Sequence, residues 1–393
     1  MFVKLPGWHR LRNKIGRMLR YEQIREVLSI PAIYRRVNAR YDHVHGSECT
    51  ADGRSAKIVY FDLRDNTFHR YLYGLIRFFD LAGVKVLIRK RIGFLGRISL
   101  FSEMIVDLPN VFLVTEKSVS SQLNVFQSAI KARDCRGILL SDEYFCAGDE
   151  SSYHVPMCMH PSLYSCSESR RRGVDLVGGR VRLFFAGNTA PSRYSNPIIS
   201  SLFRKLNRVE VVAAVRDAFP QESVSSWSPP GGSPIVLLDS PSAMVDVAGF
   251  MEMLERSDFF LSPSGVMMPL CHNTIEAMFM GVIPVLQHPE LFHPPLEDNV
   301  NCIVFHDKND LVRKVSEILA MPSARINEFR QQVLSYYNRY LSPESVVRNI
   351  MERGDKLRTI YLLSEQGSVE KFRQRQNKVN CRAGVPTGGD NML

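Results

Sequence analysis

The sequence lacks the features that mark several large protein classes. No apolar run approaches the eighteen or so residues that a membrane-spanning helix needs. The basic N-terminus has no apolar block behind it, so we expect no secretory signal. The chain has eight cysteines, and no two of them show the Cys-x-x-Cys spacing of zinc sites. We therefore expect free thiols in a reducing environment, and a cytoplasmic protein.

Positive charge is present in excess, but it is concentrated at one end. The net charge is +10, and residues 1–41 carry ten basic side chains against two acidic ones. Apolar residues recur at helical spacing in the same segment: Leu5, Trp8, Leu11, Ile15 and Met18. Such a basic amphipathic helix fits an anionic membrane surface, although it could also pack on the protein with its charges solvated. No aromatic-basic interleaving supports a nucleic-acid partner.

Length and composition suit two α/β domains with extensions, since the chain has 393 residues and 45% hydrophobic content. A polar linker at 42–55 precedes a first domain at 56–164. There the pattern alternates between strand and helix, starting with a strand at 57–63 and a helix at 67–82 capped by Thr67. Further strands are predicted at 84–88, 111–114, 137–140 and 155–159. This alternation predicts a parallel, Rossmann-like sheet.

A second domain is predicted at 181–341, after a polar boundary at 165–180. Its strands are predicted at 181–188, 209–215, 235–238, 258–261, 283–286 and 301–305. Its helices are predicted at 196–206, 246–256, 309–320 and 323–340. A further helix at 343–364 opens with Ser342 as cap and Pro343 in its first turn. Beyond Gly367 apolar periodicity is absent, which predicts a flexible tail.

The most informative stretch joins two of these strands. The buried strand 258–261 ends in the loop Ser262-Pro263-Ser264-Gly265, and a helix opens near Asn273. This helix ends at Gly281, where a left-handed residue is tolerated, and the strand Ile283–Leu286 follows. A junction of loop and helix presents unpaired N–H groups and a positive dipole end, which suit a phosphate.

Residues 258–286 resemble the nucleotide-sugar site of GT-B glycosyltransferases, most closely that of the exostosin-like group. There a loop of Pro-x-Gly type leads into a helix with an acidic residue, followed by Gly-x-Ile-Pro-Val; here Glu276 and Gly281–Val285 match. The resemblance implies two Rossmann-like domains that face a central cleft, with residues 342–365 crossing back to the first domain and 366–393 as a tail. It also implies that Ser264 and Gly265 approach the donor diphosphate, and that Glu276, in the first helical turn, holds the ribose.

Other donor contacts are expected where strands end, because open α/β sheets bind ligands at the carboxyl ends of their strands. Gly187 and Asn188 end the strand that opens the second domain. Arg193 follows them and could neutralise the diphosphate as it leaves. At the helix opening, we expect contacts from His272, Asn273 and Thr274.

Two absences bear on the chemistry that the resemblance implies. There is no Asp-x-Asp motif, with which GT-A transferases hold a metal ion, so we expect no metal and no cofactor besides the nucleotide-sugar co-substrate. Many retaining GT-B enzymes carry a second glutamate eight positions before the first, and here that position is Met268. This favours an inverting enzyme. A retaining transferase remains an alternative, as does a non-catalytic protein that binds nucleotide-sugars or glycans.

An inverting transfer needs a base that takes the proton of the acceptor hydroxyl. Asp65 and His69 follow the first strand. Asp142 and Glu143 follow the strand at 137–140 and are favoured, because a buried carboxylate at a strand end can have a raised pKa. For each of the four, the alternative is a helix cap or a solvated charge. His160 could line the cleft or shape the domain exit.

Together these patterns predict a cytoplasmic glycosyltransferase that lies on the membrane surface. Its partners would be a nucleotide-sugar donor, a glycan or lipid-linked acceptor, and an anionic membrane bound through residues 1–41. The predicted setting is the synthesis of cell-surface polysaccharide or glycoconjugate.

Overall fold

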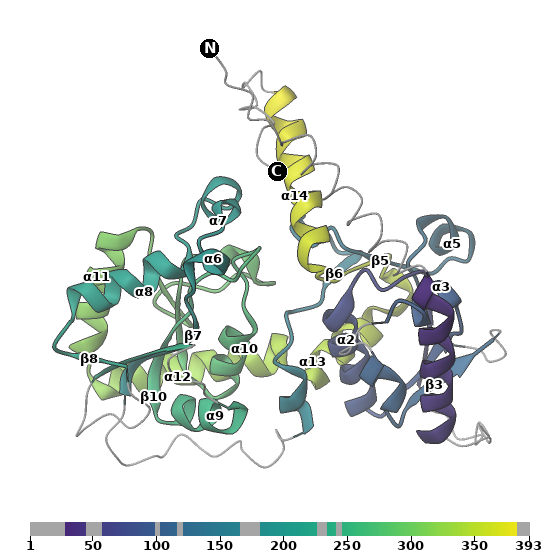
Figure 1. The fold of residues 1–393 in the computed structure, drawn as a ribbon, viewed down its shortest axis with the longest axis horizontal. Coiled ribbons are helices and arrows are strands. Elements are labelled where there is room, and N and C mark those ends of the chain that lie inside the picture. The colour runs from purple at the N-terminus through teal and green to yellow at the C-terminus, as the bar shows by residue number, and fades with distance from the viewer. Residues whose placement is uncertain are drawn as a thin grey trace, which may run out of the picture. The chain divides into compact units, whose positions relative to one another are not determined.

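The computed structural model describes residues 28–44, 57–98, 103–115, 121–165, 181–225, 234–240 and 246–382. The chain divides into two compact units, Met1–Leu140 and Ser141–Leu393 (Figure 1). Residues 1–27 of the predicted extension, 45–55 of the predicted linker and 166–180 of the predicted boundary lie outside the described residues. Residues 42–44, predicted as linker, lie in a helix. None of the described helices is both long and apolar enough to cross a membrane.

One sheet has seven strands, in the order β3-β2-β1-β4-β5-β13-β6. Their bounds are β1 Ile58–Asp62, β2 Lys85–Arg89, β3 Val111–Val114, β4 Leu123–Phe126, β5 Ile138–Ser141, β6 Ser152–His154 and β13 Thr359–Tyr361. The pairs β1–β2, β2–β3, β1–β4, β4–β5 and β6–β13 are parallel. The strands predicted at 57–63, 84–88, 111–114 and 137–140 are thus confirmed. The strand predicted at 155–159 is wrong, and β4 was not predicted.

The helices of the first unit are α2 (His69–Leu81), α3 (Ile92–Leu95), the 3-10 turn η1 (Met104–Asp107) and α5 (Ala129–Asp134). The predicted cap of α2 is wrong, because Phe68 is its N-cap and contributes no side-chain hydrogen bond. The Thr67 hydroxyl instead donates to the carboxylate of Asp65.

A helix at 28–44 packs on this unit through its basic side chains. Arg36 Nε lies 3.2 Å from Oε1 of Glu103, and Arg40 Nε donates to Oδ1 of Asp107 at 2.7 Å. Part of the positive charge of the N-terminal extension is therefore neutralised within the protein. Membrane contact through the extension is therefore proposed below only for the part before residue 28.

The second sheet has six strands, in the order β12-β11-β10-β7-β9-β8, and all five pairings are parallel. Its strands are β7 (Val181–Asn188), β8 (Ser223–Val224), β9 (Ile235–Ser240), β10 (Ser257–Leu261), β11 (Ile283–Leu286) and β12 (Ile303–Val304). Every residue of β10 and β11 is buried, as expected for central parallel strands covered on both faces. The fold class is confirmed to this extent: two parallel α/β sheets.

Helices flank these strands: α6 (Pro191–Tyr194), α7 (Pro197–Leu202), α8 (Arg208–Ala218), α9 (Val247–Glu255), α10 (His272–Phe279), α11 (Lys308–Leu319) and α12 (Ser323–Tyr336). Figure 1 shows α8 and α11 side by side at this sheet. The strand predicted at 209–215 is wrong, because these residues lie in α8. A capping box fixes the start of α8: Asn207 accepts from the N–H of Glu210, whose carboxylate accepts from the N–H of Asn207.

The C-terminal part differs most from its prediction. Helix α13 (Pro343–Arg353) ends at Gly354, which has a positive φ of 43°, and β13 and then α14 (Glu365–Arg382) follow. The single helix predicted at 343–364 is therefore wrong, as is the flexible tail over 366–382. Ser342 does cap α13 as predicted, accepting from the N–H of Ser345.

This C-terminal part also explains where the two units divide. The N–H of Leu362 donates to the carbonyl of Ser141 at 2.9 Å, and Arg353 donates to the carbonyl of Ser152 at 2.6 Å. Residues 141–165 are thus held by the end of the chain. The division consequently falls between residues 140 and 141, rather than at the predicted boundary of 165–180.

Candidate functional site

A pocket lies where two neighbouring strands of the six-stranded sheet end. Strands β7 and β10 are parallel, with Phe184 opposite Phe260, so their carboxyl ends meet at one edge. The pocket has a volume of about 210 Å³. It is lined by His160, Leu163, Ala186, Gly187, Asp246, Val247, Phe250, His272, Asn273 and Glu276.

The pocket contains some of the predicted donor residues and adds others. Gly187 enters from the end of β7, while His272, Asn273 and Glu276 come from α10. His160 also lines this pocket. The contributions from 246–250 to the pocket were not predicted, although the helix predicted at 246–256 agrees with α9.

Glu276 is a strongly perturbed group in this pocket. Only 2% of the residue is exposed, and its Oε1 accepts from the backbone N–H of His160 at 2.8 Å. Burial disfavours the charged form and raises the pKa of Glu276 to about 7. Because α10 begins at His272, Glu276 lies in its second turn. The prediction that Glu276 lies in the first turn is therefore wrong. Its carboxyl group can therefore exchange a proton near neutral pH.

Three other predicted donor residues do not line the pocket. The Ser264 hydroxyl donates to the carbonyl of Leu206 at 3.2 Å, and the Thr274 hydroxyl donates to Ser262 at 3.1 Å. A Cβ at Gly265 would lie 2.8 Å from the carbonyl oxygen of Met268, so glycine is needed there for a close backbone approach. These contacts hold the loop before α10 in shape.

The remaining predicted donor residues follow β7. Asn188 ends the strand, and its side chain accepts from the N–H of Ala190 at 2.7 Å. Arg193 lies on the short helix α6, exposed to solvent, and is not among the residues that line the pocket.

Arg208, which was not predicted, joins the segments around the pocket. Its Nε donates to the carbonyl of Ser264 at 3.2 Å and a terminal nitrogen donates to the carbonyl of Asn188 at 3.4 Å. The other terminal nitrogen lies 3.4 Å from Sγ of Cys271, the N-cap of α10. The guanidinium also lies 4.2 Å from the centre of the Tyr194 ring. Only 7% of Arg208 is exposed, so this is a buried cation.

Of the four candidate bases, Asp142 and Glu143 lie against α14. Lys371 Nζ is 3.4 Å from Oδ1 of Asp142, and the hydroxyl of Ser364 is 3.4 Å from Oδ2. Arg375 donates to Glu143 at 2.7 Å. Neither carboxylate is among the residues that line the pocket.

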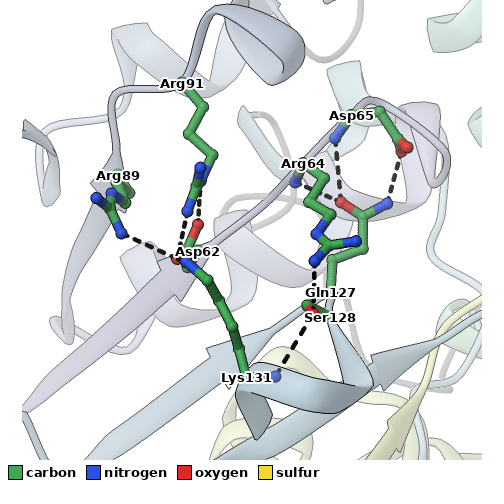
Figure 2. Close-up of polar contacts among 8 residues, drawn as sticks. All are labelled: Asp62, Arg64, Asp65, Arg89, Arg91, Gln127, Ser128 and Lys131. Atoms are coloured by element: carbon green, nitrogen blue, oxygen red, sulfur yellow. Dashed lines mark hydrogen bonds and ion pairs between the residues drawn. The ribbon is translucent and has the colours of Figure 1, made fainter. Parts of the chain in front are cut away.

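The other two candidate bases lie in the loop after β1. Asp65 accepts from the N–H of Thr67 at 3.0 Å. It also accepts from Nε2 of Gln127 at 2.5 Å (Figure 2). Burial favours its protonated form, but the hydrogen bonds from Thr67 and Gln127 outweigh this and lower the pKa of Asp65. His69 is exposed and begins α2 with a positive φ of 45°. No hydrogen bond joins its ring to the described residues.

Within the described ranges, no group of three or more His, Cys, Asp or Glu side chains could hold a metal ion. The pocket in the second unit instead offers a titratable carboxyl group, two histidines and a nearby buried cation. This set can bind hydroxyl and phosphate groups.

Comparison with known proteins finds similarity in solved structures only. No protein-family model and no curated protein matches this sequence. Similar structures include HepE from Anabaena in complex with UDP, with 13% identity, a TM-score of 0.39, and coverage of 75% of this chain and 98% of HepE. The calicheamicin glycosyltransferase CalG4 has 10% identity, a TM-score of 0.36 and coverage of 77% and 98%. The N-terminal domain of Candida albicans trehalose-6-phosphate phosphatase has 9% identity and a TM-score of 0.26, with coverage of 81% of this chain and 44% of that domain's chain. At such values the likeness assigns no residue role.

Proposed function

We propose that this chain is a GT-B glycosyltransferase, with two Rossmann-like domains. It would move a sugar from a nucleotide-sugar to a glycan or lipid-linked acceptor, with inversion and without a metal. The observation that carries this proposal is the pocket at the carboxyl edge of the six-stranded sheet, with buried Glu276 beside the loop–helix junction. The exostosin-like motif at 258–286 supports the same reading.

Glu276 would hold the ribose of the donor. A carboxyl group with a pKa of about 7 can ionise when two sugar hydroxyls donate to it, because hydrogen bonds favour the charged form. The pocket volume of about 210 Å³ is below the roughly 300–1,000 Å³ of pockets that enclose whole small ligands. It would therefore enclose one part of the donor.

Arg208 would stabilise the leaving diphosphate, in place of Arg193. Its guanidinium contacts two backbone carbonyls and a thiol, and no carboxylate among the described residues neutralises it. A buried cation of this kind binds a phosphate strongly. The first N–H groups of α10, next to His272, would add a positive dipole end.

The base would be His69. It lies just beyond the carboxyl end of β1, is exposed, and makes no ring hydrogen bond to the described residues. Positive φ at a non-glycine residue is strained, and such strain is often found at functional sites. By contrast, Asp142 and Glu143 are ion-paired with α14, and Asp65 is tied into its own turn.

The acceptor and the location follow from the charge of the extension. We place the enzyme in the cytoplasm, peripheral on an anionic membrane, where it would extend a cell-surface glycan. Because Arg36 and Arg40 pair within the first unit, the test is to delete residues 1–27. The deletion should abolish co-sedimentation with anionic vesicles, and undiminished co-sedimentation would exclude this attachment.

The experiment that tests the function is a thermal-shift screen with UDP, GDP, CMP and dTDP. A nucleotide at about one hundred times its Kd should stabilise the native protein by roughly 2.7 kcal/mol. We expect a shift with one nucleotide, lost in Glu276→Ala and kept in Glu252→Gln, whose side chain is 62% exposed. No shift with any nucleotide in the wild type would contradict the donor site.

Transfer is tested separately, with the sugar form of the nucleotide that binds. The anomeric configuration of the product, determined by NMR, distinguishes inversion from retention. Binding without transfer to any of a broad panel of acceptors would favour the non-catalytic alternative.

A further inference from the structure

A second pocket lies in the first unit, at the carboxyl ends of β1 and β2. Its volume is about 520 Å³. It is lined by Tyr34, Arg64, Arg89, Lys90, Arg91, Ile92, Gly93 and Thr115. Four of these residues are basic, and none of the described lining residues is acidic. The pocket is within the size range of small-ligand sites.

A buried carboxylate fixes the position of two of the four cations of the pocket, Arg89 and Arg91. Asp62, at the end of β1, accepts from a terminal nitrogen of Arg91 at 2.8 Å, from Nζ of Lys131 at 2.9 Å and from Arg89 at 3.3 Å (Figure 2). Burial opposes ionisation, but the hydrogen bonds and charges of Arg91 and Lys131 lower the pKa of Asp62 to about 2. The carboxylate is therefore charged at neutral pH, and three cations share it.

The cations of the pocket are held in place but not covered. The side chains of Arg89 and Arg91 are 37% and 30% exposed, so part of each guanidinium faces solvent. Arg64 is fixed by a hydrogen bond of 2.7 Å to the hydroxyl of Ser128, and Lys90 lies 5.7 Å from the centre of the Tyr41 ring. Binding an anion here would thus cost little side-chain entropy.

The charge balance indicates what such a pocket would bind. Lys131 and the four lining residues bring five positive charges, and Asp62 offsets one of them, which leaves four in excess. Mutual repulsion of four like charges is relieved by an anion that bears more than one negative charge. Guanidinium forks match phosphate oxygens in pairs, and the lysine adds a compact charge.

We propose that this pocket binds the phosphate or diphosphate group of a phosphorylated ligand. If the proposed function holds, this ligand is the acceptor, which then carries a phosphoryl group close to the sugar that is extended. The pocket also has a defined shape, because a Cβ at Gly93 would lie 2.5 Å from the carbonyl oxygen of Arg64. Four cations gathered at one open pocket suit one compact anion better than a nucleic-acid backbone, which needs an extended basic track.

The test is calorimetric titration of the full chain with inorganic pyrophosphate in saturating UDP, which occupies the donor site. The pocket pair is Arg89→Gln with Lys90→Gln, which leaves Arg91 and Lys131 on Asp62. The control pair is Arg133→Gln with Arg136→Gln, two exposed cations of the same unit with the same change in charge. We expect the Kd for pyrophosphate to rise at least about tenfold in the pocket pair relative to the wild type. The control pair should keep the Kd of the wild type.

Two further arms identify the source and the chemistry of the anion. Co-sedimentation with neutral vesicles that contain a prenyl diphosphate tests a lipid-linked source, and the soluble titration tests a free one. Lys90→Gln alone serves as a second variant should the pair fail to fold. Equal Kd values in wild type and both pairs, equal losses in both pairs, or glucuronate binding as tightly as pyrophosphate would overturn the proposal.

Failure here is distinguishable from failure of the proposed function. UDP binding is measured in the same variants and depends on the pocket with Glu276, so the pocket pair should leave it unchanged. If UDP does not bind the wild type at all, the pyrophosphate titration is repeated without UDP, and the contrast between the two pairs still decides.

Discussion

Two buried carboxyl groups lie beside strand ends in this molecule, and their environments drive them in opposite directions. Asp62 is the last residue of β1 in the first unit. It contacts Arg89, Arg91 and Lys131, which lower its pKa to about 2. Glu276 lies on α10 in the second unit and accepts one backbone N–H, and burial raises its pKa to about 7. Both are almost fully buried, with 3% and 2% exposure.

The difference shows that burial raises the pKa of a carboxyl group unless cationic partners outweigh it. Asp62 stays ionised at all physiological pH values and organises basic side chains around itself. Glu276 has no such partner among the contacts described, so its charge can change when a ligand arrives. A carboxyl group of the second kind is typical of binding and catalytic sites, whereas the first kind is a fixed counter-ion.

The largest effect should come from the titration of Glu276. The folded protein holds its proton up to about pH 7, whereas the unfolded chain releases it near 4.5. The free energy of unfolding should therefore fall as pH rises through this window, by about 3 kcal/mol in total. Glu276→Gln keeps an acceptor for His160 and should remove this fall. Urea unfolding at pH 5 and pH 8 measures it.

Histidines complicate this measurement, so the difference between variant and wild type is the quantity to follow. Burial lowers the pKa of His154 and His293, whose titration makes stability rise with pH and so opposes the fall from Glu276. They are unchanged in the variant and cancel in the difference. Glu252→Gln serves as the control and should track the wild type. A difference that stays constant between pH 5 and pH 8 would contradict the raised pKa.

A smaller effect of opposite sign is expected for Asp62. Its lowered pKa contributes stability that is present above about pH 4 and is lost as pH falls from 3.8 towards 2. Because its partners are 30% to 39% exposed, solvent screening reduces this contribution to about 1.5 kcal/mol. Asp62→Asn should lose that amount at pH 7 and about half of it at pH 3, which lies between the unfolded and folded pKa values of Asp62.

Chemical unfolding at the two pH values, with Asp134→Asn as control, tests the prediction for Asp62. The Asp134 side chain is 60% exposed, so its substitution should change little at either pH. Equal losses in Asp62→Asn at pH 7 and pH 3 would mean that its ion pairs do not stabilise the fold.

Much of the candidate donor site could be predicted because its signals are local. The strand at 181–188, the strand before the Ser262–Gly265 loop and the helix that ends before Gly281 all lie where the sequence placed them. Gly281 has a positive φ of 70°, as its position after α10 required. Local propensity, apolar runs and glycine positions suffice for elements of this kind.

What could not be predicted depends on contacts between distant parts of the chain. Asp62 and Lys131 are 69 residues apart, and no local pattern joins them. Strand β13 is only three residues long and exists because it pairs with β6, some two hundred positions earlier. Helix α14 has few apolar residues. Its Lys371 and Arg375 pair with Asp142 and Glu143, respectively. Tertiary partners decide such elements, and propensity alone does not.

The misassigned segment 209–215 is a different case, because its signal was local and was overlooked. Valines favour strands, but Asn207 and Glu210 have the spacing of a capping box, which favours a helix. The consequence was the omission of Arg208, the first residue of α8, from the candidate site. Its position depends on where this helix begins.

The smallest expected effect comes from the dependence of Arg208 on the start of α8, and it concerns cations instead of carboxyl groups. The cations around Asp62 are placed by a carboxylate, whereas Arg208 is placed by the start of a helix. Asn207→Ala removes the cap and should destabilise the protein by about 1 kcal/mol. It should also weaken the thermal shift that the bound nucleotide produces, because Arg208 would be held less firmly. Asn196→Ala removes the cap of α7 and should lower stability similarly without weakening that shift. If both variants weaken nucleotide binding equally, general destabilisation accounts for the effect, and Arg208 needs no helix cap to reach a phosphate.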